Sequence, residues 1–174
     1  KIYNGSNLLG SATADSNGDF SITLSTLSDG TYSLTATATD VSGNTSPSSS
    51  ALSITVDTTA PTAPSSLTTA SSVSDITPTI TGIAEVDSTV KIYNGSNLLG
   101  SATADSNGGF TITSSALADG SYSLTATATD SAGNISDSSS PLNITISSAS
   151  SLTDFQALNY IASNTDLILS LIHI

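Results

Sequence analysis

Gly120-Ser-Tyr-Ser-Leu-Thr-Ala-Thr-Ala-Thr-Asp130 is the stretch of this sequence that decides the fold. Tyr122, Leu124, Ala126 and Ala128 alternate with serine and threonine, a period of two that is typical of a strand with one buried face and one face in water. Almost the same stretch occurs ninety positions earlier, at residues 30–40. The pattern therefore predicts one half-buried β-strand in each of two repeats.

The two repeats align without a gap. Residues 1–56 and 91–146 are identical at 43 of 56 positions, whereas residues 57–90 have no counterpart earlier in the sequence. We therefore interpret residues 1–56 as a truncated repeat and residues 57–147 as a complete one. A repeat of roughly 90 residues is close to the ~100 residues that are typical of an immunoglobulin-like sandwich.

Strand and turn signals in residues 57–147 fit such a sandwich. About seven short segments rich in alternating apolar residues are separated by turn signals, of which Asn94-Gly95-Ser96-Asn97 predicts a tight hairpin. Leu98, Gly100, Ala102 and Ala104 continue the strand that we expect to return after this hairpin. Tyr122 follows a turn at the start of the penultimate long strand, where a tyrosine corner is expected in this kind of fold.

Composition excludes several classes of partner. The chain has 14 acidic residues, two lysines, no arginine and one histidine, and its net charge is −12. Such a chain repels phosphate, so we expect no nucleic-acid binding and no polybasic attachment to lipid. No run approaches the ~20 apolar residues of a membrane span, and without cysteine neither disulfides nor a thiolate metal site can form. Because Lys1 is not preceded by a leader, we interpret the chain as an internal fragment.

Catalytic signals are missing from the sequence. His173 is the one histidine, so the many serines have no plausible base as partner. Neither a Walker motif nor a dinucleotide-binding glycine pattern occurs. We therefore expect a protein that is not an enzyme.

Several motifs resemble the bacterial immunoglobulin-like repeats of very large secreted cell-surface adhesins. They recur in order as Pro78-Thr-Ile-Thr-Gly-Ile-Ala-Glu85, Thr89-Val-Lys-Ile-Tyr-Asn-Gly95, Leu98-Leu-Gly-Ser-Ala-Thr-Ala-Asp105 and Leu124-Thr-Ala-Thr-Ala-Thr-Asp-Ser-Ala-Gly-Asn134. Val56-Asp-Thr-Thr-Ala-Pro61 is similar to the linker between such repeats. The resemblance covers residues 1 to about 147.

This resemblance implies an all-β chain of tandem antiparallel immunoglobulin-like β-sandwiches, the first of them truncated. It also implies an extracellular chain at a bacterial cell surface, exported by a type I system of the RTX type. Such repeats act as non-catalytic spacers in adhesion and biofilm formation, often with calcium. The expected partners are neighbouring repeats of the same chain, while a surface or glycan target would be bound by other domains.

Two alternative functions stay open. One is a module that binds a glycan or a protein, for which the outward-facing Tyr93 and its repeat equivalent Tyr3 are the aromatic candidates. The other is an accessory domain of an exported enzyme, which would need a catalytic module elsewhere.

Calcium is the metal that this sequence could bind, because it prefers oxygen ligands and the loops offer carboxylates. Counting strands up and down places six carboxylates near the junction of the two repeats. The alternative is that these residues form ordinary solvated turns. The predicted metal-binding residues are Asp29, Asp57, Glu85, Asp87, Asp105 and Asp130.

A second calcium pattern is weaker. Asp15-Ser-Asn-Gly-Asp19 has the alternating oxygen spacing of a calcium loop, but Phe20 stands where an EF-hand has glycine and Thr26 where it has glutamate. We interpret this stretch as a turn.

The C-terminal residues differ from the repeats. Residues 148–168 are expected to begin a short helical module, with Thr153 or Asp154 as its N-cap. Residues 169–174 match what a sequencing-library adapter encodes, and we interpret them as an artefact.

Overall fold

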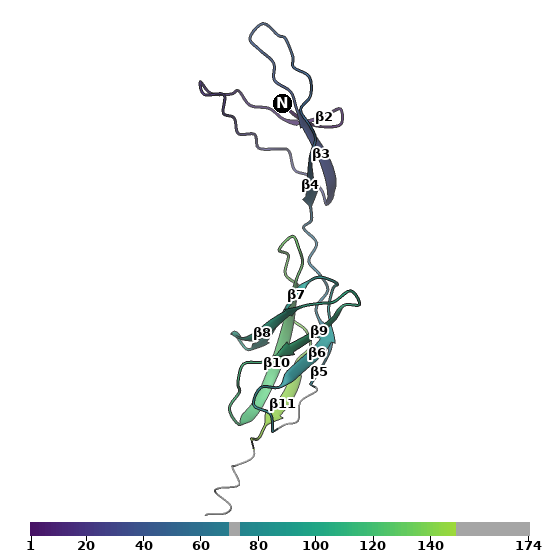
Figure 1. Cartoon of the computed structure of the whole chain (residues 1–174), viewed down its shortest axis with the longest axis vertical. Coiled ribbons are helices and arrows are strands. Elements are labelled where there is room, and N and C mark those ends of the chain that lie inside the picture. The colour runs from purple at the N-terminus through teal and green to yellow at the C-terminus, as the bar shows by residue number, and fades with distance from the viewer. Residues whose placement is uncertain (70–73, 149–174) are drawn as a thin grey trace, which may run out of the picture. The chain divides into compact units, whose positions relative to one another are not determined.

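The computed structural model of the chain describes residues 1–69 and 74–148, which contain strands and turns but no helix (Figure 1). In this part of the chain no helix is long and apolar enough to cross a membrane. The chain divides into two compact units. Unit 1 comprises Lys1–Pro61 and Thr129–Ser136, and unit 2 comprises Thr62–Ala128 together with the chain from Asp137 onward. The expected all-β class is confirmed.

Unit 2 contains two antiparallel sheets. One has the order β5 (Ser65–Thr69), β6 (Thr79–Ile83) and β9 (Gly109–Thr113). The other has the order β11 (Leu142–Ile146), β10 (Gly120–Thr129), β7 (Thr89–Asn94) and β8 (Asn97–Thr103). Strand β10 is hydrogen-bonded to β11 on one side and to β7 on the other, and its ten residues show the longest alternating pattern of the described strands. Seven strands in two sheets form the predicted immunoglobulin-like sandwich.

The inner faces of the two sheets bury a small apolar core. Leu124, Ala126 and Ala128 of β10 are 0% exposed, as are Ile80 of β6 and Val90 of β7. Alternate residues of each strand therefore face inward, as the period of two predicts. The remaining core residues are Ile92, Leu99, Ala104, Phe110, Ile112, Leu117 and Ile146.

A β-bulge within β8 decides which of two adjacent leucines is buried. Leu98 is 47% exposed, and the core position belongs to Leu99, which is 4% exposed. The register explains this, because Ile92 pairs with Gly100 while Tyr93 pairs with Leu98, so that Leu99 is an extra residue in a β-bulge. The hairpin that precedes it is formed as expected, with Gly95 at a φ of 57°.

The tyrosine corner is confirmed in both repeats. The Tyr122 hydroxyl donates a hydrogen bond of 2.8 Å to the carbonyl oxygen of Ala118. The Tyr32 hydroxyl does the same to Ser28, at 2.7 Å. Each bond ties the start of a long strand to the turn before it.

Unit 1 has a single four-stranded sheet, with the order β2 (Asn7–Gly10), β1 (Ile2–Asn4), β3 (Gly30–Ala36) and β4 (Leu52–Val56). These strands are the equivalents of β8, β7, β10 and β11. Pairing of Gly30 with Val56 repeats the pairing of Gly120 with Ile146. In the described residues of unit 1 there is no equivalent of β5 or β6, and residues 19–23, which correspond to β9, are not in a strand.

Two sequence-based predictions lie outside the described residues. These are the helical segment at 148–168, of which only residue 148 is described, and the proposed artefact at 169–174. The predicted repeat boundary after residue 56 stays a prediction.

Candidate functional site

Four acidic turns of the molecule share one local structure. In each, a carboxylate oxygen accepts hydrogen bonds from the backbone N–H groups two and four residues later, and a glycine three residues later has a positive φ. The aspartate thus serves as a turn former. The four turns begin at Asp15, Asp40, Asp105 and Asp130. For Asp15, this geometry confirms the interpretation as a turn.

Asp29 has a different role, because it binds residues that follow its own repeat. One carboxylate oxygen accepts hydrogen bonds from the Thr58 amide at 3.1 Å and the Thr58 hydroxyl at 2.7 Å. The other accepts the Thr59 hydroxyl at 2.7 Å. Asp29 lies in the turn before β3, and Thr58 follows β4, so one side chain fixes the chain where it leaves the sheet.

The same arrangement occurs in unit 2. Asp119, in the turn before β10, accepts hydrogen bonds from the Ser148 amide at 2.9 Å and the Ser148 hydroxyl at 2.6 Å. The two bonded residues are 29 positions apart in both repeats. We call each of these contacts an exit latch, formed by Asp29 with Thr58 and Thr59 or by Asp119 with Ser148.

Both latches favour the charged form of the aspartate. The Thr59 hydroxyl, and then the Thr58 hydroxyl, lower the pKa of Asp29 below its ordinary value. The Ser148 hydroxyl, and then its amide, do the same to the pKa of Asp119. Hydrogen bonds to a carboxylate lower its pKa because protonation weakens it as an acceptor.

This shift sets the pH dependence that we expect of the latch. A group whose folded-state pKa is depressed stabilises the folded form at pH values above its unfolded-state pKa. That stabilisation is lost as the pH falls through the folded-state pKa. The Thr58 and Ser148 amide signals in an NMR pH titration should therefore stay constant near neutrality and move only in the acid range.

In the variants Asp29→Ala and Asp119→Ala, the amide signals of Thr58 and Ser148 should appear at neutral pH where those of the parent chain appear in acid. Asp87→Ala serves as the control, because the Asp87 carboxylate accepts no hydrogen bond in the described part of the chain. Amide signals that do not respond to either latch variant would show that the carboxylates do not hold Thr58 and Ser148.

The six predicted metal-binding residues fall in both units. Asp29, Asp57 and Asp130 belong to unit 1, whereas Glu85, Asp87 and Asp105 belong to unit 2. Within unit 1, the Asn134 side-chain amide donates to the Asp130 carboxylate at 2.8 Å and to the Asp57 carbonyl at 3.1 Å. The Asp57 carboxylate accepts the Thr59 amide at 3.0 Å.

The turn between β6 and β7 carries Glu85 and Asp87. Ser88, which is 1% exposed, donates its hydroxyl to the Glu85 carbonyl at 2.7 Å. Asp87 has a φ of 61°, a conformation that aspartate adopts more readily than most residues. The turn is therefore held by the Ser88 hydroxyl and the Glu85 carbonyl, and in the described residues neither the Glu85 nor the Asp87 carboxylate takes part in these contacts.

A metal ion would compete with contacts that the aspartates already make. In the described residues, no group of three or more Asp, Glu or His side chains is close enough together to hold a metal ion. Asp29 uses both carboxylate oxygens in its latch, Asp130 uses both in its turn, and Asp105 uses one. Calcium binding at the six carboxylates stays a prediction.

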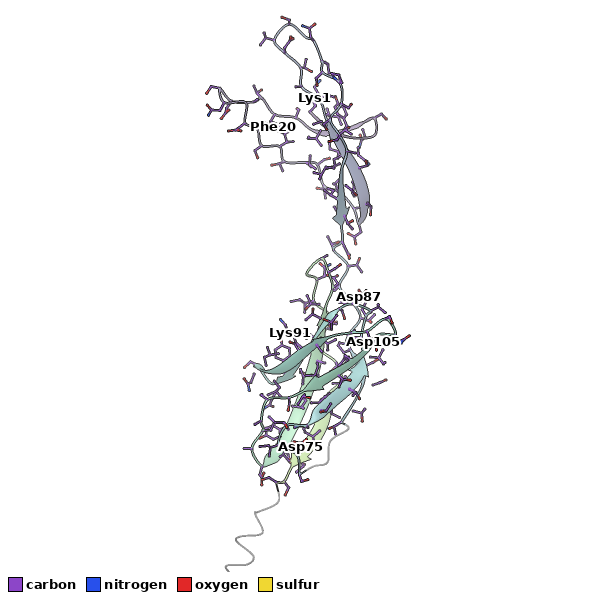
Figure 2. All side chains as sticks on the ribbon, viewed as in Figure 1. Lys1, Phe20, Asp75, Asp87, Lys91 and Asp105 are labelled. Atoms are coloured by element: carbon purple, nitrogen blue, oxygen red, sulfur yellow. The ribbon has the colours of Figure 1, made fainter. Side chains whose placement is uncertain are left out.

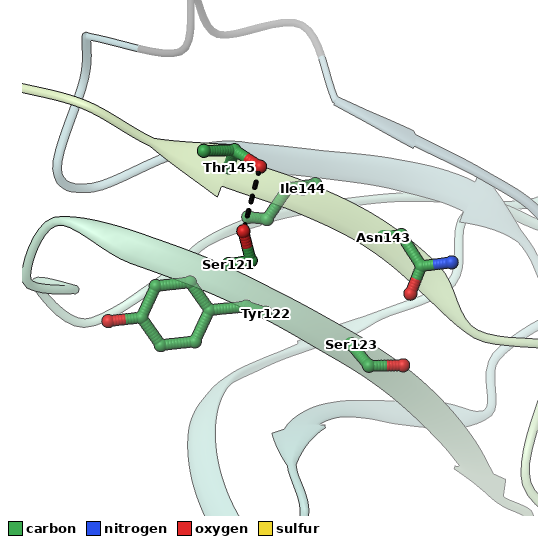
Figure 3. A pocket seen from close by; sticks show the side chains of 6 residues that line it. All are labelled: Ser121, Tyr122, Ser123, Asn143, Ile144 and Thr145. Carbon is green, nitrogen blue, oxygen red and sulfur yellow. Dashed lines mark hydrogen bonds between the residues drawn. The ribbon is translucent and has the colours of Figure 1, made fainter.

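The outer face of β10 and β11 bears a shallow depression of about 380 Å³. Figure 3 shows its hydroxyl and amide side chains, with Ser121 and Thr145 joined by a hydrogen bond of 3.1 Å. The aromatic candidates for ligand binding, Tyr93 and Tyr3, lie elsewhere and are half-buried. The aromatic residue that lines the depression is Tyr122, which is half-buried and whose hydroxyl is bound to the Ala118 carbonyl in the tyrosine corner.

Sequence reasoning missed half of the first latch and all of the second. It singled out Asp29 but not its partners Thr58 and Thr59, and it missed Asp119 and Ser148. A signal was present, because a hydroxyl residue follows the turn aspartate by 29 positions in both repeats.

Comparison with known proteins gives a family and several similar folds. A family model described as "Bacterial Ig-like domain" matches residues 1–58 and 64–148. No curated protein matches the chain. Several solved structures are similar, and the three described next each have a TM-score below 0.5.

The first similar structure is titled "Biofilm associated protein - BSP domain"; it is 26% identical, with a TM-score of 0.42, over 86% of this chain and 25% of that one. Fibronectin(III)-like modules of Clostridium thermocellum CbhA are 18% identical, with a TM-score of 0.49, over 85% of this chain and 77% of theirs. A tetra-tandem repeat from the extending region of a large adhesion protein is 22% identical, with a TM-score of 0.42, over 77% of this chain and 40% of that one. The chain thus spans about a quarter of the length of the first of these structures.

Proposed function

Because this chain belongs to the bacterial Ig-like domain family, we propose that its repeats are non-catalytic spacer modules of an extracellular bacterial adhesin. In this role they hold an adhesive part of the protein away from the cell surface and support cell adhesion or biofilm formation. Their partners are neighbouring repeats of the same chain. Export by a type I system belongs to the same proposal.

The observation that carries this proposal is the exit latch, which occurs in both repeats. A spacer must control the direction in which the chain leaves each module, whereas a ligand-binding module has no such need. Asp29 and Asp119 each hold a hydroxyl residue directly after the last strand of their repeat. Near-identical repeats with a repeated exit contact suit an array whose property is length.

The surface chemistry agrees with an extended, solvated array. Serine and threonine cover the outer faces, and only 9% of the residues are charged. The net charge of −12 disfavours association with nucleic acid.

A glycan array probed with the full chain separates the spacer from a binding module. A spacer binds none of the glycans, so the binding signal at the glycan spots should equal that at the blank spots. Saturable binding that is lost in Tyr93→Ala or Tyr3→Ala would instead establish the binding module. Circular dichroism of both variants checks that they still fold, because each should show the same strand content as the parent chain.

Calcium at the six carboxylates is a second element of the proposal. We expect calcium to raise the melting temperature of the full chain and EDTA to reverse the change, because bound cations stabilise the state that binds them. Glu85→Gln with Asp87→Asn is the matched variant, since these two carboxylates carry no hydrogen bond that the substitution would break in the described residues. An unchanged melting temperature with calcium and with EDTA would remove calcium from the proposal and leave the spacer role intact.

A further inference from the structure

Four asparagines of this chain are followed directly by glycine: Asn4, Asn17, Asn94 and Asn107. Asparagine is a thermolabile residue. It is most reactive before glycine, because glycine has no side chain to hinder attack by its own amide nitrogen. The four pairs fall into two kinds of turn, and each kind occurs once in each repeat. The same chemical pair is therefore present in two different backbone settings.

The first setting is the hairpin between β7 and β8. Asn94 pairs with Asn97, and Gly95 in the turn between them has a φ of 57°. In the described residues, neither the Gly95 amide nor the Asn94 side chain makes a hydrogen bond. A Cβ atom added to Gly95 would have no atom within 4 Å other than those of its neighbours in the chain. The Gly95 nitrogen and the Asn94 carboxamide can therefore approach each other.

The second setting is the turn that begins at Asp105, which Figure 2 labels, and leads into β9. The Gly108 amide donates a hydrogen bond of 2.9 Å to the Asp105 carbonyl. One carboxylate oxygen of Asp105 accepts the amides of Asn107, at 2.8 Å, and Gly109, at 2.9 Å. The nitrogen that would have to attack Asn107 is thus already bonded, and the nearby negative charge opposes loss of its proton.

The first repeat contains the same two settings. The Gly18 amide donates to the Asp15 carbonyl at 3.1 Å, and the Asp15 carboxylate accepts the Asn17 amide at 2.8 Å. Gly5, in the turn between β1 and β2, has a φ of 59°, and its amide donates no hydrogen bond within the part of the chain that the structure describes. The difference between the settings therefore belongs to the type of turn.

We propose that Asn94 and its equivalent Asn4 are sites of spontaneous deamidation, whereas Asn107 and Asn17 are protected. At Asn94 the Gly95 nitrogen forms a bond to Cγ, the Cγ–Nδ2 bond breaks, and the side-chain nitrogen leaves as ammonia with the amide proton. Water then opens the resulting succinimide ring to aspartate or iso-aspartate. Each event adds one negative charge. The reaction needs no enzyme or metal and is independent of the spacer role.

Iso-aspartate at position 94 would also change the hairpin. It adds one backbone atom between residues 94 and 95, which a two-residue turn between β7 and β8 cannot absorb while Asn94 stays paired with Asn97. The amide signals of Asn97 and Leu98 should therefore shift as iso-aspartate accumulates. The variant Asn94→Asp carries the added charge without the added atom, so its hairpin should stay paired.

The test is incubation of the full chain in mildly alkaline buffer below its melting temperature, followed by cleavage before aspartate and mass spectrometry. This cleavage places Asn94 in residues 87–104 and Asn107 in residues 105–118. Aspartate at position 94 creates a new cleavage site, whereas iso-aspartate changes the mass alone. Asn107 should convert at least about tenfold more slowly than Asn94, because the hydrogen bonds of its turn must break first.

Two controls separate the effect of the fold from that of the sequence. In urea, where the turns are lost, Asn94 and Asn107 should convert at similar rates. Asp105→Ala removes the carboxylate from its turn and should speed conversion of Asn107, while the rate at Asn94 in the same chain stays unchanged. Three results would overturn the proposal: conversion of Asn94 no faster than that of Asn107 in the folded chain, the same ratio of rates in urea, or no gain at Asn107 in Asp105→Ala.

Discussion

Replacing Leu99 with alanine is expected to lower the free energy of unfolding of unit 2 by about 2–5 kcal/mol. The same change at Leu98, the adjacent residue, should alter it by less than about 0.5 kcal/mol. Leu99 is 4% exposed and packs in the core, so its truncation leaves a cavity, whereas Leu98 is 47% exposed and its truncation leaves none. The pair measures which leucine the β-bulge turns inward.

Urea unfolding followed by the NMR signals of β10 measures this difference within unit 2. Leu9→Ala and Leu8→Ala provide the same comparison in unit 1, where the two side chains are 7% and 49% exposed. Equal losses for Leu98→Ala and Leu99→Ala would contradict the register in which Tyr93 pairs with Leu98.

The strands of unit 2 could be predicted because their signals are local. Alternation in Gly120–Thr129 identifies a strand with one buried face, and the glycines of the turns mark where the strands end. The bulge could not be predicted in this way, because Leu98 and Leu99 are both apolar and either could face inward. One inserted residue changes which leucine is buried, and only the pairing with β7 decides it.

Burial in unit 1 could not be predicted from alternation either. Phe20 and Phe110 occur in nearly identical stretches, yet one is 60% and the other 4% exposed. The difference comes from β6, which lies far from Phe110 in sequence and beside it in space. Alternation identifies the apolar face of a strand, but it does not show whether a second sheet packs on that face and buries it.

The acidic residues were predicted as a group by counting strands, and their individual roles follow from local chemistry. Asp105 and Asp130 satisfy backbone N–H groups of their own turns, while Asp29 binds side chains after its sheet. All three are followed by a glycine within four residues, so the glycine alone does not separate a turn former from a latch. The latch depends on a hydroxyl group brought near by the pairing of β3 with β4.

Replacing Ser139 with alanine should lower the free energy of unfolding of unit 2 by about 1–3 kcal/mol, because a buried N–H group then loses its acceptor. The Ser139 hydroxyl oxygen accepts a hydrogen bond of 2.9 Å from the Ala126 amide, and Ala126 is 0% exposed. Water cannot reach this amide while the two sheets are packed together. Ser139→Thr keeps the hydroxyl group and should retain most of the stability.

Ser49 is the matched control, because its hydroxyl oxygen accepts the Ala36 amide at 3.0 Å in the same way. Ser49 is exposed and Ala36 is half-buried, so water can replace the lost acceptor. Ser49→Ala should therefore cost less than about 1 kcal/mol. Amide hydrogen exchange of Ala126 and Ala36 measures both substitutions in one chain. Equal effects at the two sites would mean that the second sheet of unit 2 does not exclude water from this bond, which would contradict the closed sandwich around β10.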